Sequence, residues 1–391
     1  MKVAFVIPYF YPAWEYGGPP RVAYDLACAL VDRGHEVRVL TTDSGGAQRI
    51  TEADLDSIRK NERDGLRTFY SRNLSNYLAY RHRIFLPLEL FRSMGQQLRG
   101  CDVVHVHEFR STLAVPAYRA TRQLGIPFVL SPHGGLRRLG KETLKAVYDR
   151  MWGNRILKDA AAVLSVSPVE EQESLDAGVE PYRVRSLPNG VNGELFEQLP
   201  DRGSFRTRYG IHQPRIILFL ARLNWTKGID VLISAFRKMR REDPDVALVI
   251  AGPDDGYGDQ ARRLAADLGS SVVLTGVLDE RGKCEALVDS DLLVIPSRHE
   301  MFPVTALEAL MCGTPILASS VCGIPPSLDP SRGVARFRVG DAADLAVRMS
   351  ESLGSPSSAQ ERANLGRERV VERFLMPTIA GIAEGIYSSV T

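Results

Sequence analysis

Short apolar runs rich in β-branched residues alternate along the chain with longer stretches whose apolar positions recur about every 3.6 residues. In residues 21–33, for example, Val22, Leu26 and Leu30 follow the helical spacing, and Gly34 stands where a helix end favours a left-handed residue. Strands that alternate with amphipathic helices are typical of parallel sheets covered by helices. The pattern therefore predicts an α/β protein.

Two series of strands are predicted, with helices between them. We expect the first series at Val3–Ile7, Glu36–Thr41, Val103–His107, Phe128–Ser131, Ala161–Val166 and Val184–Leu187. We expect the second series at Ile216–Leu220, Val246–Ala251, Val272–Leu274, Leu292–Ile295 and Ile316–Ala318. The helices expected between these later strands are Ile229–Arg241, Asp259–Leu268, Lys283–Val288 and Val304–Met311.

Glycine and proline are concentrated between the two series. Together with Asn189, the turn residues there are Pro188, Gly190, Gly193, Pro200, Gly203, Gly210 and Pro214. We place a domain boundary in this segment, which gives a first domain over residues 1–188 and a second over residues 189–374. Ligands of parallel sheets bind outside the carboxyl ends of the strands, so two such domains predict a cleft lined by residues that directly follow strands.

Composition narrows the class of protein without naming a reaction. Of the 391 residues, 44% are hydrophobic and 25% are charged, which is typical of a globular protein and excludes a fibrous or disordered one. The net charge of +2 argues against a dedicated nucleic-acid binder, so we expect no nucleic-acid partner. No apolar run approaches the length of about 18 residues that predicts a membrane-spanning helix.

The first residues and the cysteines bear on the cellular compartment. The start, MKVAFVIPYFYP, contains one lysine and two prolines, and it predicts a strand and a loop rather than a signal peptide. The five cysteines are scattered and form no CxxC pair. We therefore expect reduced thiols and a cytoplasmic location.

A pair of glycines lies in the loop after the first strand. Gly17 and Gly18 precede the first predicted helix, where backbone N–H groups and the helix dipole favour an anion. The loop lacks the GxGxxG spacing of dinucleotide-binding proteins. A flexible turn without a ligand is the alternative interpretation.

Two cations follow the first strand of the second series. Arg222 and Lys227 lie in the loop between that strand and the next helix. The arginine fork and the lysine charge can converge on one phosphate group. The alternative is a solvated basic loop.

Two glutamates, Glu300 and Glu308, enclose seven residues. We expect Glu300 in the loop after a strand and Glu308 about one turn into the next helix, with Pro303 as the first helical residue. Carboxylates in this place suit the hydroxyl groups of a sugar or a ribose. Alternatively, Glu300 is solvated and Glu308 is a helix salt-bridge partner. Three apolar residues are expected in the core under either interpretation: Phe302, Leu307 and Leu310.

The remaining polar candidates are histidines and one aspartate pair. His105 and His107 share one face of a predicted strand, but without a third ligand they favour satisfied strand-end histidines over a metal site. His133 directly follows a strand and precedes two glycines, so we expect it to point into the cleft. Asp289 and Asp291 form a DxD pattern, but their place between a helix and a strand favours a structural role.

These motifs, in this order, resemble those of retaining glycosyltransferases of family 4, which have the GT-B fold. The matching segments of the first half are YGGPPRVAYDLACALVDRGHEVRVLTT, DVVHVHEF, SPHGGL and LPNGV. Those of the second half are LFLARLNWTKGIDVLISAF, LVIAGPDDG, VVLTGVL and VIPSRHEMFPVTALEALMCGTPILAS, the last of which contains the E-x7-E pattern. The resemblance implies two Rossmann-like parallel-sheet domains that face each other across a cleft, with residues 375–391 packing back on the first domain.

The resemblance also implies the roles of individual residues. The diphosphate of a nucleotide-sugar would contact Gly17, Gly18, Arg222 and Lys227. The ribose would contact Glu308, the base the loop at Gly276, and the donor sugar Glu300, with Met301, Phe302, Pro303 and Val304 beside the sugar and phosphates. The implied catalytic residues are Glu300, His133, Arg222 and Lys227, and those on the acceptor side are Tyr16, His107 and His133.

The implied activity is a metal-independent, retaining hexosyltransferase reaction that needs no cofactor. The donor would be a UDP- or GDP-sugar and the acceptor a hydroxyl group of a glycan or a lipid-linked molecule, in the synthesis of glycans, exopolysaccharides or glycolipids. A nucleotide-sugar 2-epimerase, a phosphorylase and a non-catalytic subunit of the same fold are the alternatives.

The chain departs from the family pattern at two places. Pro303 stands where a glycine is usual, which removes one backbone donor. The loop Cys322–Pro326 lacks the carboxylate that often follows the last strand. We expect the first departure to affect the choice of donor.

Two stretches of the first half suggest contact with a membrane. Residues 77–91 mix aromatic, basic and apolar side chains. Residues 137–145 add the cations Arg137, Arg138, Lys141 and Lys145. Such surfaces favour peripheral contact with the cytoplasmic face of an anionic membrane that carries the acceptor. The alternative is an ordinary helix with solvated arginines and a core face formed by Leu88, Phe91 and Met94.

Overall fold

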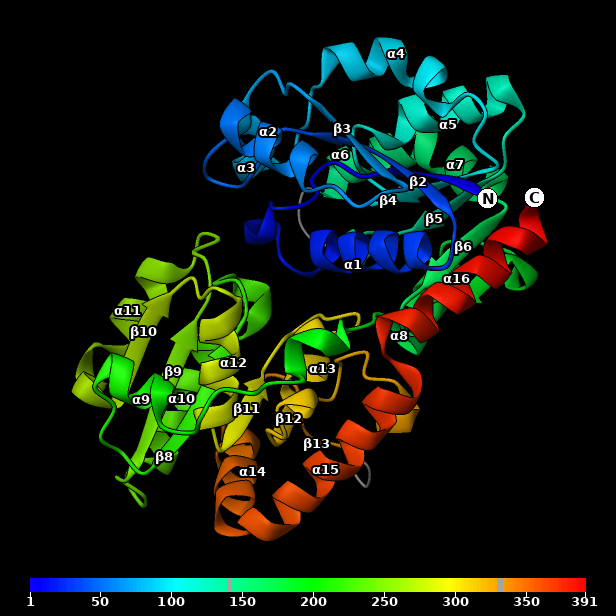
Figure 1. Ribbon diagram of the computed structural model, residues 1–391. Coiled ribbons are helices and arrows are strands. Elements are labelled where there is room, and N and C mark those ends of the chain that lie inside the picture. Colours follow the sequence, from blue (N-terminus) through cyan, green and yellow to red (C-terminus); the bar gives the residue numbers. More distant parts are fainter. Residues whose placement is uncertain (139–141, 329–332) are drawn as a thin grey trace. The chain divides into compact units, whose positions relative to one another are not determined.

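The computed structural model describes residues 1–138, 142–328 and 333–391 (Figure 1). The chain forms two compact units, the first made of residues 1–190 and 376–391 and the second of residues 191–375. The sequence predicts the change of domain between residues 188 and 189, and the structure has it between residues 190 and 191. Each unit contains its own parallel sheet.

The first unit is built on a seven-stranded sheet in the order β3-β2-β1-β4-β5-β6-β7, and each of these strand pairs is parallel. The strands are β1 (Lys2–Val6), β2 (Glu36–Thr42), β3 (Leu66–Ser71), β4 (Val103–His107), β5 (Phe128–Ser131), β6 (Ala162–Ser165) and β7 (Val184–Ser186). A parallel strand buried on both faces has a continuous apolar sequence. This is why β1 and β4 stand out in the sequence.

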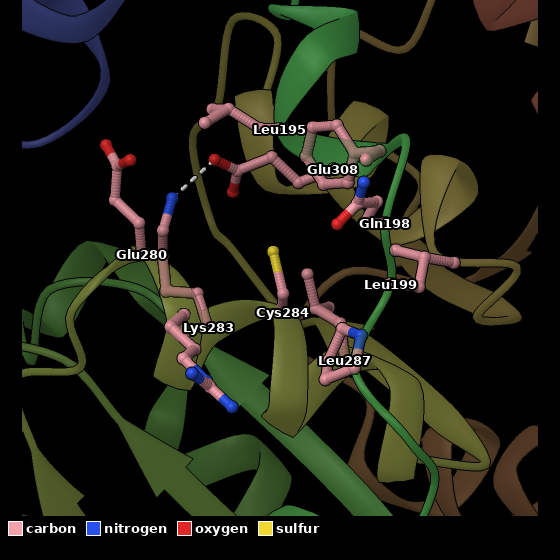
Figure 2. A pocket seen from close by; sticks show the side chains of 11 residues that line it. Leu195, Gln198, Leu199, Glu280, Lys283, Cys284, Leu287 and Glu308 are labelled. Atoms are coloured by element: carbon pink, nitrogen blue, oxygen red, sulfur yellow. Dashed lines mark hydrogen bonds and ion pairs between the residues drawn. The ribbon is translucent and has the colours of Figure 1, made fainter.

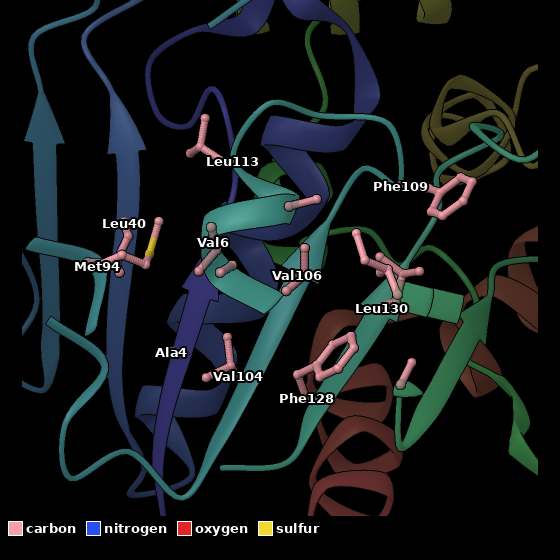
Figure 3. Packing of buried hydrophobic residues seen from close by; sticks show 14 of the residues in the cluster. Ala4, Val6, Leu40, Met94, Val104, Val106, Phe109, Leu113, Phe128 and Leu130 are labelled. Atoms are coloured by element: carbon pink, nitrogen blue, oxygen red, sulfur yellow. The ribbon is translucent and has the colours of Figure 1, made fainter. Parts of the chain in front are cut away.

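Helices cover both faces of this sheet. The helices of the first unit are α1 (Gly18–Asp32), α2 (Glu52–Lys60), α3 (Asn76–His82), α4 (Leu88–Leu98), α5 (Ala114–Leu124), α6 (Glu142–Tyr148), α7 (Asn154–Asp159), α8 (Pro168–Asp176) and α16 (Met376–Val390). One core joins the sheet to α4, α5 and α7, and Figure 3 shows its strand residues Ala4, Val6, Val104, Val106, Phe128 and Leu130. The core on the other face joins the sheet to α1 and α16.

The last helix, α16, belongs to the first unit although it follows the second in the chain. Tyr387 of α16 is fully buried, and its hydroxyl hydrogen-bonds to Nδ1 of His105 on β4 at 2.8 Å. On the surface, Nε of Arg33 donates to the carboxylate of Glu384 at 2.8 Å. The end of the described chain therefore completes a core that begins with β1.

The second unit has a six-stranded parallel sheet in the order β10-β9-β8-β11-β12-β13. The strands are β8 (Arg215–Leu220), β9 (Val246–Ala251), β10 (Val272–Gly276), β11 (Leu292–Ile295), β12 (Ile316–Ser319) and β13 (Val334–Phe337). The helices are α9 (Ser204–Tyr209), α10 (Ile229–Met239), α11 (Gly258–Ala265), α12 (Glu280–Asp289), α13 (Val304–Met311), α14 (Ala342–Gly354) and α15 (Pro356–Arg373). The core on one face joins this sheet to α10, α11 and α14.

Most predicted strands lie within one or two residues of the observed ones, and two observed strands were not predicted. Both of these, β3 and β13, are edge strands, and most of their residues are only partly buried or exposed. Among the described residues, no helix is long and apolar enough to cross a membrane.

Candidate functional site

The turn after β8 carries Arg222 and Lys227, and its shape is fixed by its own side chains. The side-chain oxygen of Asn224 accepts hydrogen bonds from the backbone N–H and the hydroxyl of Thr226, each at 3.0 Å. These bonds begin the 3₁₀ turn Trp225–Lys227. The side chains of Lys227 and Arg222 are only 16% and 29% exposed. The interpretation of this segment as a solvated basic loop is therefore wrong.

The glycine that ends this turn permits a close backbone approach. Gly228 has φ +69°, and a Cβ atom there would lie 2.0 Å from the carbonyl oxygen of Pro296. Glycine alone combines this conformation with such a contact. Since Pro296 directly follows β11, Gly228 lets the Lys227 turn lie against the end of that strand.

Arg298, which also follows β11, fixes the same turn through hydrogen bonds. Its backbone N–H donates to the carbonyl oxygen of Thr226 at 2.7 Å, and its guanidinium makes two bonds to the Asp230 carboxylate, at 2.8 and 2.6 Å. Burial opposes ionisation of Asp230, but the Arg298 guanidinium holds the pKa of that carboxyl below its usual value. The charged pair therefore persists at neutral pH and fixes the start of α10.

Lys227 has a carboxylate partner in Glu300. The Lys227 ammonium forms an ion pair with the Glu300 carboxylate, which is 18% exposed. The carbonyl oxygen of Glu300 accepts from the N–H of Gly323 at 2.9 Å, so the loop Cys322–Pro326 supports Glu300 through its backbone. Charges partly shielded from water interact more strongly than exposed ones. The alternative of a solvated Glu300 is therefore wrong.

Arg222 has a partner that the sequence analysis did not name. Its guanidinium forms an ion pair with Asp255, which lies in the loop after β9. Nδ2 of Asn224 donates to the same carboxylate at 3.2 Å. The signal that could have found Asp255 is its position in the loop after a predicted strand, the same rule that selected Arg222.

The helix after β11 has its predicted bounds, Val304–Met311, but Pro303 lies outside it. α13 begins at Val304, and Pro303 has an extended backbone, with ψ 120°. Pro303 is therefore the residue before the helix, and its prediction as the first helical residue is wrong. Its carbonyl oxygen accepts from the N–H of Ala306 at 3.0 Å, which begins the first turn.

Glu308 lies on α13 and lines a cavity of about 450 Å³ (Figure 2). Its side chain is 8% exposed, and one carboxylate oxygen accepts from Nζ of Lys283 on α12 at 2.6 Å. Glu308 is thus a salt-bridge partner, as the alternative interpretation had it, but the pair joins two helices beside a cavity. Lys283 is a second site residue that the sequence analysis missed.

Two backbone loops meet beside β9 and β10. The N–H of Gly252 donates to the carbonyl oxygen of Gly276 at 2.8 Å, and a Cβ atom on Gly252 would lie 2.0 Å from the carbonyl oxygen of Ala221. Gly276 has φ +73° and is exposed. Val277, which follows it, is 62% exposed and offers an apolar surface. A contact of this loop with a base stays a prediction.

Two structural predictions in this unit are confirmed. Asp289 is fully buried and accepts from the backbone N–H of Arg206 at 2.8 Å, and Asp291 accepts from that of Ile216 at 2.8 Å. The DxD pattern therefore caps and joins elements. The predicted core residues Phe302, Leu307 and Leu310 are buried.

In the first unit, three histidines lie in contact at the ends of β4 and β5. The rings of His105 and His107 stack with centroids 3.9 Å apart, and Nδ1 of His107 lies 3.0 Å from Nε2 of His133. Both ring nitrogens of His105 have partners, Tyr387 at 2.8 Å and Ser131 at 2.7 Å. His105 is therefore a satisfied strand residue, as expected. His107 instead orients His133.

The turn that carries His133 has a strained backbone, and hydrogen bonds to the Glu170 carboxylate hold it in place. His133 has φ +51°, a region that non-glycine residues rarely adopt. The buried Glu170 of α8 accepts from the N–H of Gly134 at 2.6 Å and from that of Val166 at 2.9 Å. A Cβ atom on Gly135 would lie 2.8 Å from the carbonyl oxygen of Pro132. Glu170 thus fixes a backbone conformation that positions the imidazole.

The histidine cluster predicts how stability depends on pH. Burial lowers the pKa of His133 to about 4, that of His105 to about 3, and that of His107 well below its usual 6.5. Below pH 6.5 the unfolded chain binds protons that the native unit does not bind. We therefore expect the free energy of unfolding to fall between pH 7 and pH 5, by about 1.4 kcal/mol per pH unit for each fully titrating histidine.

Urea denaturation at pH 7 and pH 5 measures this dependence. His105→Gln should make it shallower, and His82→Gln, a change of an exposed histidine on α3, should leave it as it is. Equal stability of the wild-type protein at the two pH values would contradict a neutral, buried cluster.

Comparison with known proteins assigns both units to one class of enzyme. Residues 17–190 match the family described as "Glycosyl transferase 4-like domain", and residues 201–369 match "Glycosyl transferases group 1". The chain is 32% identical over 305 residues to D-inositol 3-phosphate glycosyltransferase 1 of Catenulispora acidiphila, covering 70% of this chain and 71% of that protein. The chain belongs to glycosyltransferase family 4.

Other relatives and solved structures support the family and the fold. The glycosyltransferase is 25% identical to a glycogen synthase of Mycobacterium tuberculosis, covering 96% of this chain and 93% of that one. Anabaena Alr3699/HepE, solved in complex with UDP and glucose, matches with a TM-score of 0.80 at 19% identity over the full length of both chains. Sucrose-phosphate synthase from Thermosynechococcus elongatus matches with a TM-score of 0.78 at 23% identity, covering 99% and 98% of the two chains. The GT-B fold is confirmed.

The start of α1 in this glycosyltransferase offers fewer donors than predicted. Gly17 has φ +101° and precedes the helix, and Gly18 is its first residue. The next two residues are prolines without N–H groups, so only Gly18 of the first three helical residues can donate. Tyr16 is buried, with its hydroxyl 2.6 Å from Oγ of Ser44. Its contact with an acceptor stays a prediction.

The two stretches predicted to contact a membrane, residues 77–91 and 137–145, both expose apolar side chains. Met94 is buried and Phe91 partly buried, but Leu88 is 46% exposed and Tyr77 is 67% exposed. The alternative of a core-facing helix is therefore confirmed for Met94 and Phe91, and only its placement of Leu88 in the core is wrong. In the second stretch Leu144 is 63% exposed. Lys141, one of the predicted cations, lies outside the described residues.

Within residues 1–138, 142–328 and 333–391, no three His, Cys, Asp or Glu side chains form a group that could hold a metal ion.

Proposed function

We propose that this glycosyltransferase moves a sugar from a nucleotide-diphospho-sugar, a UDP- or GDP-sugar, to a hydroxyl acceptor, with retention of configuration at the anomeric carbon. The observation that carries the proposal is the Lys227–Glu300 ion pair at the carboxyl end of the second sheet. It joins a cation suited to phosphate with a carboxylate suited to sugar hydroxyls. UDP-glucose bound to the Anabaena structure of the same fold supports this choice of donor.

The chemical difficulty is the departure of a nucleoside diphosphate, on which negative charge develops. Donors fixed in a partly desolvated site stabilise such charge because they need little reorganisation. Lys227 and Arg222 are held in place by Glu300 and Asp255, so they meet this requirement. We assign the counter-charge to these two side chains, with no metal and no cofactor.

Retention follows from an attack on the face that the diphosphate leaves. Glu300 is engaged by Lys227, so it is assigned to the hydroxyl groups of the donor sugar rather than to attack on the anomeric carbon. The acceptor hydroxyl transfers its proton to an oxygen of the departing phosphate. His133, kept neutral by its lowered pKa, contributes a hydrogen bond and no charge.

The nucleoside is assigned to the cavity beside Glu308. Its carboxylate accepts hydrogen bonds from ribose hydroxyls, and Lys283 holds it in orientation at 2.6 Å. The exposed backbone at Gly276 and the apolar Val277 supply a surface for the base. Met301, Phe302, Pro303 and Val304 form the backbone beside the sugar and phosphates.

A panel of nucleotide-sugars in a thermal-shift assay tests the proposal. A donor that binds the native state raises Tm as its concentration exceeds its Kd. We expect one UDP- or GDP-sugar to do so in the wild-type protein and to do so less in Glu308→Gln, while Glu242→Gln, a change in the exposed segment after α10, responds like the wild type. No stabilisation by any member of the panel would overturn the proposal.

Product analysis distinguishes the reaction from its alternatives on the same fold. Transfer requires an acceptor, whereas a 2-epimerase converts the donor alone and a phosphorylase requires free phosphate. We expect a glycoside product of the donor's own anomeric configuration, with full activity after treatment with EDTA. An inverted product contradicts retention, and a rate restored only by added divalent metal contradicts the assignment of the counter-charge.

The acceptor is assigned to a membrane surface, in the synthesis of a glycan, exopolysaccharide or glycolipid. On and just beyond α6, Leu144, Val147 and Met151 are 63%, 50% and 53% exposed at helical spacing. Arg137 and Arg138 are 58% and 51% exposed. Exposed apolar residues flanked by cations favour peripheral binding to anionic lipid on the cytoplasmic face.

Co-sedimentation with vesicles of phosphatidylglycerol and phosphatidylcholine checks this surface. We expect binding that weakens with salt, and a loss of binding in Leu144→Ser/Val147→Ser. The matched control is Val347→Ser, since Val347 is 54% exposed on α14 of the other unit. Binding that is equal in both variants would contradict a role for this surface.

A further inference from the structure

Cys284 and Cys312 are 28 residues apart in the sequence, but they belong to two segments of the second unit that contact each other through side chains. Cys284 follows Lys283 on α12, and Cys312 lies one turn after Glu308 at the end of α13, with its N–H bonded to the Glu308 carbonyl oxygen at 3.1 Å. The Lys283–Glu308 ion pair, at 2.6 Å, therefore holds the two segments that carry the cysteines beside each other. Beside them, the hydroxyl of Thr314 donates to the carbonyl oxygen of Leu287 at 2.8 Å, which is a second tie to α12.

The two thiols differ from the other three in their access to solvent. Cys284 and Cys312 are partly buried, whereas Cys28, Cys101 and Cys322 are buried. Figure 2 shows the Cys284 sulfur directed into the cavity that Glu308 lines. A small oxidant in this cavity therefore reaches Cys284.

The charge state of the pair also favours reaction. A hydrogen bond from the Cys312 thiol lowers the pKa of Cys284, although burial opposes this, and the same contact raises the pKa of Cys312. Burial raises the pKa of Cys322 to about 11. Since the thiolate is the nucleophile, Cys284 is the most reactive of these three thiols.

We propose that Cys284 and Cys312 form a reversible thiol–disulfide site that takes a peroxide as its oxidant and controls the cavity at Glu308. The disulfide is inferred from the contacts between α12 and the end of α13. The control of the cavity rests on the proposed function, in which that cavity holds the nucleoside of the donor.

The chemistry balances in two steps. The Cys284 thiolate attacks one oxygen of hydrogen peroxide, the O–O bond breaks, and Cys284 becomes a sulfenic acid as the second oxygen leaves as water after taking a proton. The Cys312 thiol then attacks the sulfenic sulfur, forms the S–S bond and releases a second water. Two thiols are oxidised and one peroxide is reduced to two waters. A dithiol reductant reverses the change by thiol–disulfide exchange.

The disulfide acts on the nucleoside cavity through the neighbouring ion pair. Forming it requires the two sulfur atoms to approach to about 2.05 Å, which pulls the Cys284 turn of α12 toward the end of α13. Lys283 is the next residue on α12, so its ammonium moves relative to Glu308. The carboxylate loses the orientation in which it binds ribose, and nucleotide affinity falls.

Mass spectrometry of the full chain tests the modification itself. After treatment with hydrogen peroxide and alkylation of remaining thiols, we expect a cross-linked peptide pair containing Cys284 and Cys312, which dithiothreitol separates. Cys284→Ser should lack it, Cys312→Ser should leave Cys284 as a sulfenic acid that dimedone traps, and Cys101→Ser should behave like the wild type. Absence of the cross-link in the wild-type protein would overturn the site.

A nucleotide titration tests the control of the cavity. The probe is UDP or GDP, whichever stabilises the reduced protein, and we expect its Kd to rise about tenfold on oxidation and to recover with dithiothreitol. An unchanged Kd in the cross-linked protein would overturn the control while leaving the disulfide site. If neither nucleotide binds the reduced protein, the donor assignment fails, and the mass measurement still decides the disulfide.

Discussion

Lys227→Ala should lower kcat by a factor of 10² to 10³ while the protein stays folded. Removing one fixed donor that stabilises charge in a transition state typically costs about 2.7–4 kcal/mol. Lys227 is such a donor, because Glu300 and the Thr226–Gly228 backbone hold it in place. Steady-state kinetics with the donor identified by the thermal-shift panel measures the effect.

Three further variants make this result specific. Lys227→Arg keeps the positive charge and should retain more activity than the alanine variant. Arg222→Ala should lose activity to a similar extent, whereas Lys238→Ala, which removes an exposed lysine from α10, should leave kcat unchanged. Near-normal turnover of both Lys227→Ala and Arg222→Ala would overturn the role of these side chains as counter-charge.

Gly228→Ala should both destabilise the second unit and reduce activity. The new methyl group would meet the Pro296 carbonyl oxygen at 2.0 Å in a backbone with φ +69°, so the turn must move away from β11. The strain of the left-handed conformation alone costs about 1–2 kcal/mol in a non-glycine residue. The collision adds to it, and the movement displaces Lys227 from Glu300.

Gly210→Ala is the matched control for this change. Gly210 has φ +61°, and a Cβ atom there meets nothing within 4 Å. Urea denaturation should therefore show a loss of about 1–2 kcal/mol for Gly210→Ala, with kcat unchanged, and a larger loss for Gly228→Ala together with a lower kcat. Equal losses in the two variants would contradict the close approach between the turn and β11.

Much of the fold could be predicted because buried parallel strands have a simple sequence pattern. The four apolar positions Leu292–Ile295 are buried on both faces, and the prediction of that strand agrees with the structure. The sequence LRTFYS of β3 has no such run, because an edge strand exposes part of its surface. Its pairing with β2 depends on a neighbour that the sequence pattern cannot show.

The candidate site could be predicted in its positions but not in its pairings. Arg222 and Glu300 were found because they follow strands, but their distances to carboxylate or ammonium partners depend on how several loops meet. The sequence therefore did not show that Lys227 binds Glu300 or that Lys283 binds Glu308. For the same reason, the sequence shows Cys284 and Cys312 only as two scattered cysteines, and the packing of α12 against the end of α13 makes them neighbours.

Backbone conformation was the second source of error. A proline in the first turn of a helix is common because it lacks an N–H group there, and this rule placed Pro303 one residue too far into α13. The structure puts it in an extended conformation at the helix start. Local rules of this kind are accurate to about one or two residues.

The position of α16 determines the order in which the protein can fold during its synthesis. Residues 191–375 are continuous, so the second unit can fold as soon as it has left the ribosome. The first unit must wait for Met376–Val390, and until then His105 lacks Tyr387 and the core beside α1 is open. We therefore expect the part of the chain that is made first to be the part that reaches its native state last.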